Sequence, residues 1–301
     1  YEIYMGDWSS DVCSSDQIDD AEASAQLDCG RPEQALQTVR RLTAAAPNYA
    51  PGHGMLARLL WEHGEELAPG EDPCAMLRAA VAQQPDNQPL RLELSRFLLD
   101  ARVAAEAIGH LQVLRAASDG PALVVLQARA LELLDDRKGI QELFDSTYLR
   151  MGGDAQYMNM YVRHLLRTGA ADLAAQRSLD LLQRQPFNQL ALAHLAIAWR
   201  LIGDAREHWL CDYERFVCDL PLEIEPAILE QLQSTLSALH TARREPVDQS
   251  LRGGTQTAGV LFGRREPVIR ALREACARAI ARYVAALDRK STRLNSSHPY
   301  R

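Results

Sequence analysis

Small, mostly apolar residues recur along the chain at a nearly constant interval. Successive members are separated by 34, 38, 33, 34 and 34 residues, and they are Ala23, Ala57, Ser95, Ala128, Val162 and Ala196. An interval of this length is typical of helix–turn–helix repeats, each of which is too small to bury its apolar face alone. The pattern therefore predicts helix pairs that stack on one another to bury a continuous core.

Turn residues and prolines divide each repeat at matching places. Seven residues after the small position, a turn residue can end the first helix in a left-handed conformation; these residues are Gly30, Gly64, Gly169 and Gly203, with Arg102 and Asp135 as weaker matches. Five residues later, a small or apolar residue marks the second helix, at Ala35, Ala107, Ile140 and Ala174. The residues that close a repeat are Pro47, Pro85, Asp119 and Pro186. Four extra residues in a Pro/Gly-rich loop, 65–73, explain the interval of 38.

The spacing Gly-x4-Ala-x11-Pro resembles that of tetratricopeptide repeats. It is intact at Gly30, Ala35 and Pro47, and again at Gly169, Ala174 and Pro186. The aromatic positions of that family's consensus are mostly absent, and the third and fourth repeats match least. The resemblance implies an all-α, tetratricopeptide-like α-solenoid of about six helix pairs over residues 17–220, and a role in binding proteins or peptides.

Composition and charge narrow the class of protein. With 47% hydrophobic and 24% charged residues among 301, the chain can bury an extended core. No apolar run approaches the roughly 18 residues of a membrane span. The six cysteines form no Cys-x-x-Cys pair, which favours reduced thiols and a cytoplasmic location. Residues 243–290 hold eleven basic and five acidic side chains, but without interleaved aromatics they favour a solvated helix face over a nucleic-acid-binding surface.

The two ends of the chain follow neither the helical nor the strand period. The sequences GDWSSDVCSSD, near the start, and STRLNSSH, near the end, resemble translated sequencing-adapter sequence. We therefore expect residues 1–16 and 290–301 to be non-native tails, and the natural polypeptide to run from about Gln17 to about Arg289.

The pattern changes after the sixth repeat. Pro221 and Pro226 interrupt the array, and apolar residues at helical spacing predict one more helix that begins near Pro226. Residues 244–263 contain four glycines and lack a helical period. Thr255, Thr257 and residues 260–262 suit a strand, and a last helix is predicted to start at Pro267. A short, incomplete α+β segment is therefore expected after the solenoid.

A second resemblance concerns this segment. The sequences WLCDYERFV at 209–217, LH at 239–240 and DQSLRGGTQT at 248–257 resemble bacterial proteins in which tetratricopeptide repeats precede a C-terminal 2-oxoglutarate/iron(II) oxygenase domain. The match covers roughly residues 210–287. It implies that residues 221–289 are a linker helix and the N-terminal part of such a domain, and that a longer parent protein is a 2-oxoglutarate/iron(II)-dependent dioxygenase.

In that family a His-x-Asp/Glu pair and a distant His hold the iron, while a basic residue holds 2-oxoglutarate. Three protein ligands leave coordination positions open for the keto acid and for dioxygen. His240, within the matched region, is not followed two residues later by Asp or Glu. We therefore expect no catalytic, metal or firm cofactor site in this chain. Fe(II) and 2-oxoglutarate are expected only for the longer parent.

Five polar residues are candidates for the cofactor-side mouth of the complete oxygenase: Gln249, Arg252, Thr255, Gln256 and Thr257. The alternative is that they belong to a turn and a first strand whose polar groups are satisfied by local hydrogen bonds. The sequence leaves both interpretations open.

An arginine directly follows four consecutive small positions, at Arg58, Arg96, Arg129 and Arg163. In tetratricopeptide repeats this place on the first helix faces the concave groove, so the resemblance implies a row of guanidinium groups. Each could hold a carboxylate by two parallel hydrogen bonds. The alternative is that each arginine pairs with a neighbouring acid such as Glu62, Glu93 or Glu132.

Two functions follow from the sequence. In the first, this chain is the peptide-binding repeat array of a dioxygenase, lacks the catalytic core, and prefers acidic peptides or a free C-terminal carboxylate. In the second, the chain is a non-enzymatic scaffold for protein–protein interaction. Neither function involves nucleic acid or a membrane.

Overall fold

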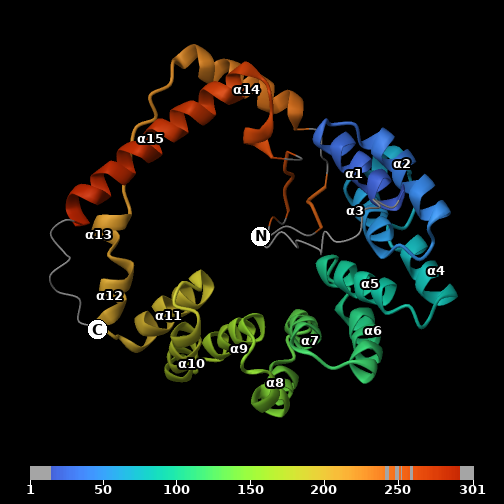
Figure 1. The fold of residues 1–301 in the computed structure, drawn as a ribbon, viewed down its shortest axis with the longest axis horizontal. Helices are drawn as coiled ribbons and strands as arrows, with labels where there is room; N and C mark the ends of the chain where they lie inside the picture. The colour runs from blue at the N-terminus through green and yellow to red at the C-terminus, as the bar shows by residue number, and fades with distance from the viewer. Residues whose placement is uncertain (1–14, 241–243, 248–250, 252, 258–259, 292–301) are drawn as a thin grey trace. The chain divides into compact units, whose positions relative to one another are not determined.

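The computed structural model describes residues 15–240, 244–247, 251, 253–257 and 260–291, most of which are helical and none of which form a strand (Figure 1). These residues divide into two compact bodies. The first body consists of the described residues up to 136 and those of 239–257. The second consists of residues 137–238 and 260–291.

The first body contains the helices α1 (Ser15–Asp28), α2 (Pro32–Ala45), α3 (Ala50–Leu67), α4 (Ala75–Gln83), α5 (Gln88–Asp100), α6 (Ala104–Ala117) and α7 (Pro121–Leu133). The second body contains α8 (Arg137–Met151), α9 (Ala155–Arg167), α10 (Ala171–Arg184), α11 (Gln189–Ile202), α12 (Arg206–Cys211), α13 (Tyr213–Phe216), nearly all of α14 (Pro226–Leu239), the short 3-10 helix η1 (Leu261–Gly263) and α15 (Pro267–Ser291).

In chain order, α1 to α12 alternate as the first and second helices of six successive repeats, and the fourth repeat is divided between the two bodies, with α7 in the first and α8 in the second. Within each body, contacts between helices mostly link each helix to the next one or two along the chain, as in a stack of repeats. The prediction of an all-α array of about six helix pairs is confirmed. The last pair is abbreviated, because α12 has only 6 residues.

The recurring small residues lie where helices pack together. Ala23, Ser95 and Ala128 are fully buried, and Ala57 and Val162 are 1% exposed. Ala196, in the last pair, is only partly buried. A larger side chain at these places would separate packed helices, which explains the periodicity in the sequence.

The first helix of five repeats ends in the same hydrogen-bonded turn. The residue seven positions after the small one has a positive φ in each, and these residues are Gly30, Arg102, Asp135, Gly169 and Gly203. In each turn the next N–H donates to the carbonyl five residues back, as from Val103 to Leu98 at 2.7 Å and from Ala170 to Leu165 at 2.9 Å. These bonds define the Schellman motif. The weaker sequence matches, Arg102 and Asp135, therefore adopt the turn that glycine adopts elsewhere.

The second repeat departs from this pattern. Gly64 was expected to end the first helix, but α3 continues past it to Leu67. The four extra residues of the 65–73 loop allow the helix to run on, so no left-handed residue is needed at Gly64.

Side-chain caps start the first helix in three repeats. Asn87, Asp154 and Asn188 each accept a hydrogen bond from the backbone N–H three residues later, at 3.2, 2.8 and 3.0 Å. Each cap satisfies one N–H that the helix itself leaves without a partner. These three caps were not among the residues predicted from the sequence to start helices.

The end of the chain is helical where a strand was predicted. Residues 255–257 have no regular structure, and residues 261–263 form η1 instead of continuing a strand, so the α+β prediction is wrong for the described residues. A strand needs a partner whose backbone completes its hydrogen bonds, and none is present in the described ranges. The predicted helix starts at Pro226 and Pro267 are confirmed.

Candidate peptide-binding surface

Three of the four predicted arginines lie on neighbouring first helices of the first body. Arg58 on α3 donates from Nη1 to Oε1 of Glu93 on α5, at 3.1 Å. Arg129 on α7 donates from Nη2 to Oδ1 of Asp100, also on α5, at 2.6 Å. Both pairs cross from one repeat to the next, and α5 supplies the carboxylate in each.

Arg96 lies on α5 between these two acids. Residues three and four apart share one face of a helix, so Glu93, Arg96 and Asp100 form a single stripe. Together with Arg58 and Arg129, this stripe makes a line of alternating charges across three helices. We call these five residues the charge row.

The members of the charge row differ in how far they are already neutralised. The side chains of Arg58 and Arg129 are 38% and 39% exposed and already hold carboxylates. Arg96 is exposed and forms no ion pair with an acid in the described part of the chain. Arg58 and Arg129 therefore pair with acids of the same chain, as in the alternative considered for the sequence. The partner of Arg129 is Asp100, whereas Glu132 was among the acids suggested. Arg96 retains a guanidinium that a ligand can reach.

A glycine keeps the first ion pair in place. A Cβ atom built on Gly54 of α3 would lie 1.9 Å from Oε1 of Glu93. Any larger residue would force the Glu93 side chain away from Arg58. The absence of a side chain at position 54 thus allows α5 to present its carboxylate to α3.

Arg163 belongs to the second body, where it lies exposed on α9. Its charge contributes to the lowered pKa of His194 on α11, for which burial is the larger cause. Arg163 is therefore not part of the charge row, whose five residues all lie in the first body, and the role predicted for Arg163 remains a separate prediction.

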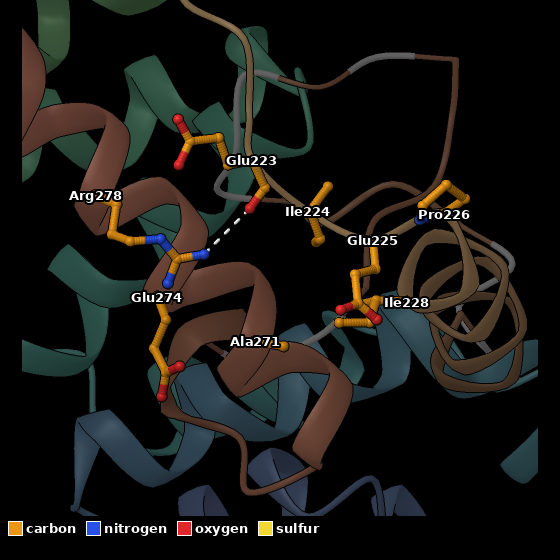
Figure 2. A pocket seen from close by; sticks show the side chains of 8 residues that line it. All are labelled: Glu223, Ile224, Glu225, Pro226, Ile228, Ala271, Glu274 and Arg278. Atoms are coloured by element: carbon orange, nitrogen blue, oxygen red, sulfur yellow. Dashed lines mark hydrogen bonds between the residues drawn. The ribbon is translucent and has the colours of Figure 1, made fainter.

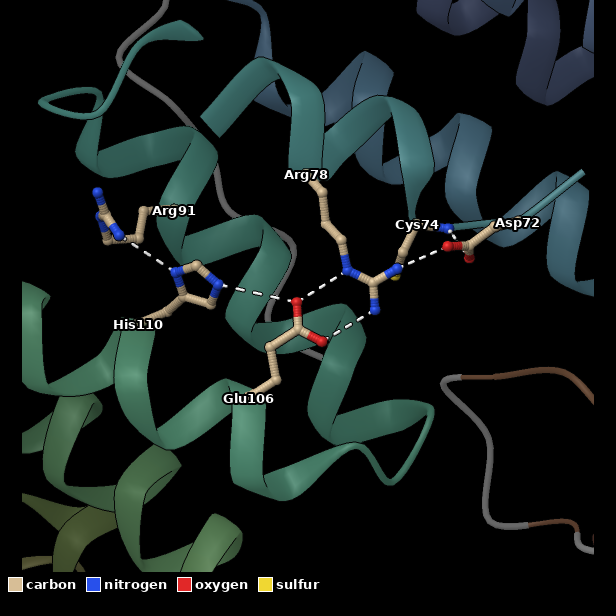
Figure 3. A network of polar contacts seen from close by, with 6 residues as sticks. All are labelled: Asp72, Cys74, Arg78, Arg91, Glu106 and His110. Carbon is tan, nitrogen blue, oxygen red and sulfur yellow. Dashed lines mark hydrogen bonds and ion pairs between the residues drawn. The ribbon is translucent and has the colours of Figure 1, made fainter. Parts of the chain in front are cut away.

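A second polar network ties the second helices of the first body together (Figure 3). Arg78 on α4 donates two hydrogen bonds to Glu106 on α6, at 2.8 and 2.9 Å, and a third to Asp72 at 2.6 Å. The bond from Arg78 holds the pKa of Glu106 below its usual value. His110 lies between Glu106 and Arg91, and burial lowers its pKa. The sequence carries no signal for this network, because its members come from four separate segments.

Cys74 lies beside this network but takes no part in its ion pairs. Its side chain is 4% exposed, and burial raises the pKa of the thiol to about 11. A thiol of this kind is neutral near pH 7 and therefore a poor nucleophile. Cys74 directly precedes α4, and its side chain packs in the hydrophobic core of the first body.

His53 and His194 are two of the three histidines that are buried in the described part of the chain. His53, on α3, approaches the carbonyl oxygen of Pro47 with Nε2 at 3.1 Å. Because a carbonyl only accepts, Nε2 carries the proton, and Nδ1 has no partner among the described residues. Burial lowers the pKa of both His53 and His194.

A segment far along the sequence packs on α3. Trp61 donates from Nε1 to the carbonyl oxygen of Glu245 at 3.0 Å, and the Arg244 guanidinium carbon lies 3.5 Å from the centre of the Trp61 ring. Val247 is 1% exposed and belongs to the core formed by α3 to α7. Sequence reasoning missed this contact, which joins residues 184 apart.

The residues proposed for the oxygenase mouth are only partly described. Gln249 and Arg252 lie outside the described residues. Thr255 and Thr257 form hydrogen bonds to the two ring nitrogens of His240, and Gln256 is exposed. The two threonines therefore bond to a residue at the end of the helix that precedes this segment, and the roles predicted for the five residues stay predictions.

An open pocket of about 600 Å³ lies in the second body, between the start of α14 and α15 (Figure 2). Its charged lining consists of three carboxylates, Glu223, Glu225 and Glu274, and one guanidinium, Arg278. Arg278 donates to the carbonyl oxygen of Glu223 at 3.1 Å. A dianion such as 2-oxoglutarate would meet an excess of negative charge here, so this pocket does not fit the keto acid.

The described residues do not fit an iron centre either. They include no group of three or more His, Cys, Asp or Glu side chains placed to hold a metal ion. One His-x-Glu sequence does occur, at His63 and Glu65 in α3, far from the region that resembles the oxygenase. Residues two apart on a helix point to different faces, so these two side chains do not converge.

Comparison with known proteins adds little to this geometry. No family model matches the sequence, and no curated protein matches it significantly. A similar solved structure is that of a tetratricopeptide repeat protein from Parabacteroides merdae ATCC 43184, with 10% sequence identity and a TM-score of 0.49. The match covers 74% of this chain and 86% of that one. The all-α, repeated architecture is evident from the helices of this chain itself. Among the described helices, none combines the length and apolar character that a membrane span requires.

Proposed function

We propose that the chain is a helical-repeat scaffold that binds a protein or peptide, and that the charge row takes an acidic segment of this partner. The observation that supports the proposal most directly is the exposed guanidinium of Arg96 between two arginine–carboxylate pairs. A partner carboxylate that pairs with Arg96 would extend the same chemistry that already joins α3, α5 and α7. Arg163 is proposed as a further contact in the second body.

The expected contribution of Arg96 is modest. An exposed ion pair contributes up to about 1 kcal/mol, and a charged hydrogen bond in a partly dry site about 1.5–3 kcal/mol. Replacing Arg96 with Ala should therefore weaken the binding of an acidic peptide by roughly tenfold. The loss should shrink as salt is added, because exposed charges are screened over about 8 Å at physiological ionic strength.

The test is a fluorescence-anisotropy titration of the full chain with acidic and neutral peptide pools, each with a free or an amidated C-terminus. Arg96→Ala, Arg129→Ala and Arg163→Ala are compared with Arg31→Ala, a control at an exposed arginine on the N-cap of α2. The proposal expects a preference for acidic peptides and the largest loss in Arg96→Ala. Equal binding of both pools, or an equal loss in Arg31→Ala, would contradict it.

The oxygenase is retained as a proposal only for a longer protein that contains this sequence. It is supported by the resemblance over residues 210–287, while the pocket and the described histidines do not favour it. For this chain we expect no formation of succinate from 2-oxoglutarate with added Fe(II). Succinate above a blank without protein would contradict the scaffold proposal, and a His-x-Asp/Glu pair encoded downstream would support an active parent.

A further inference from the structure

A short segment outside the helices, Arg244–Val247, is held on the first body by three different kinds of contact. The Arg244 guanidinium lies over the Trp61 ring, the Trp61 indole N–H binds the backbone carbonyl of Glu245, and Val247 is buried in the core. Phe97 of α5 supports the indole edge-on, with ring centroids 6.1 Å apart. We use the name Trp61 surface for the surface formed by Trp61, Phe97 and the core residues that surround the Val247 side chain.

These contacts have the form of peptide recognition. An aromatic face attracts the cation, one main-chain hydrogen bond fixes the register, and an apolar position takes one aliphatic side chain. Pro246 restricts Glu245 to an extended conformation, so the segment loses little freedom when it is held. Nothing in the contact depends on the segment belonging to the same chain.

The same five residues, Arg-Arg-Glu-Pro-Val, occur twice in the sequence, at 243–247 and at 264–268. In the second copy Pro267 opens α15, and Arg264 pairs with Glu266 at 3.1 Å. Because the pentapeptide starts a helix in one place and lies on Trp61 in the other, its own sequence does not dictate the conformation at 244–247. The Trp61 surface therefore selects that conformation.

We propose that the Trp61 surface is a docking site for a partner protein that presents an extended Arg-Glu-Pro-Val segment, and that residues 244–247 are its intramolecular occupant. A tethered segment competes at an effective concentration on the order of millimolar. The chain therefore blocks its own site until the tethered segment is displaced. The proposal does not depend on the charge row, and either can fail alone.

The test uses the full chain and a fluorescein-labelled peptide of sequence Ala-Arg-Arg-Glu-Pro-Val-Asp-Gln, which copies residues 242–249. Fluorescence anisotropy is measured with the wild type and with the double variant Arg244→Ala/Val247→Ala, in which the tethered occupant is weakened. We expect the peptide to bind the double variant at least tenfold more tightly than the wild type. Adding Trp61→Leu to the double variant should abolish binding.

Two controls separate recognition from damage to the fold. Arg244→Ala alone removes no buried side chain and should still strengthen peptide binding by a few-fold. A peptide with Asp in place of Val should not bind any of the variants, because its carboxylate would have to enter the core.

Three results would overturn the proposal. They are equal affinity of the wild type and the double variant, equal binding of the two peptides, and a wild-type dimer that the peptide dissociates. The last would mean that the occupant comes from a second copy of the chain.

Discussion

Replacing Arg102 with Gly should stabilise the protein, since Arg102 adopts a conformation that glycine adopts at the matching place in other repeats. Its φ is 63°, and that of Gly169 is 82°. A left-handed backbone costs a residue with a Cβ atom about 1–2 kcal/mol. Glycine loses about 0.5–1 kcal/mol more conformational entropy on folding than alanine does. The net gain expected for Arg102→Gly is therefore about 0.5–1 kcal/mol.

Two further variants isolate the backbone effect. Arg102→Ala removes the exposed side chain and retains the unfavourable φ, so its stability should stay within about 0.5 kcal/mol of the wild type. Gly169→Ala introduces the same strain in the second body and should cost about 0.5–1 kcal/mol. A Cβ on Gly169 meets no atom within 4 Å, so this loss would come from φ and not from a clash.

Stability is measured by urea unfolding followed by circular dichroism. Hydrogen exchange of the amides in α5 and α6 accompanies it, because repeat arrays can unfold in parts. The reasoning predicts slower exchange in Arg102→Gly than in Arg102→Ala. Equal unfolding midpoints and equal exchange in these two variants would show that the left-handed turn carries no strain.

Three other predictions concern single groups. Asn188→Ala should cost about 1 kcal/mol by removing a helix cap, whereas Asn188→Asp, which keeps the acceptor, should cost less in urea unfolding. Burial lowers the pKa of His53 and of His194, so the unfolded chain binds more protons below a pH of about 6.5. The free energy of unfolding should therefore fall as the pH drops from about 7 to 5, with a shallower slope when both are replaced by Gln. Cys74, with a thiol pKa raised to about 11, should react with iodoacetamide much more slowly than the exposed Cys29 until the chain unfolds, as read by mass spectrometry.

The repeat was predictable because it is encoded locally and many times. Each small residue, turn residue and closing proline acts within one helix pair, so a single sequence shows the pattern. Even Arg102 and Asp135 could be placed in their turns by position alone. The strand after Gly254 was predicted wrongly, because β-branched residues favour a strand only where a partner strand exists.

The candidate surface was less predictable because its contacts join distant segments. The arginine positions followed from the period, but the partner of Arg129 is Asp100, 29 residues earlier on another helix. The contact of Arg244 with Trp61 depends on how the segment after α14 returns to α3, and no periodic signal reports that path.

The charge row limits how this part of the chain can change by loss of repeats. Helix α5 supplies Glu93 to the repeat before it and Asp100 to the repeat after it. Deleting the α5–α6 pair would remove both carboxylates and leave Arg58 and Arg129 without them. Duplicating the pair would instead lengthen the row, because Arg96 stands at the same place in its repeat as Arg58 and Arg129 and could face the acids of the added copy. Gain and loss of this repeat therefore have unequal consequences.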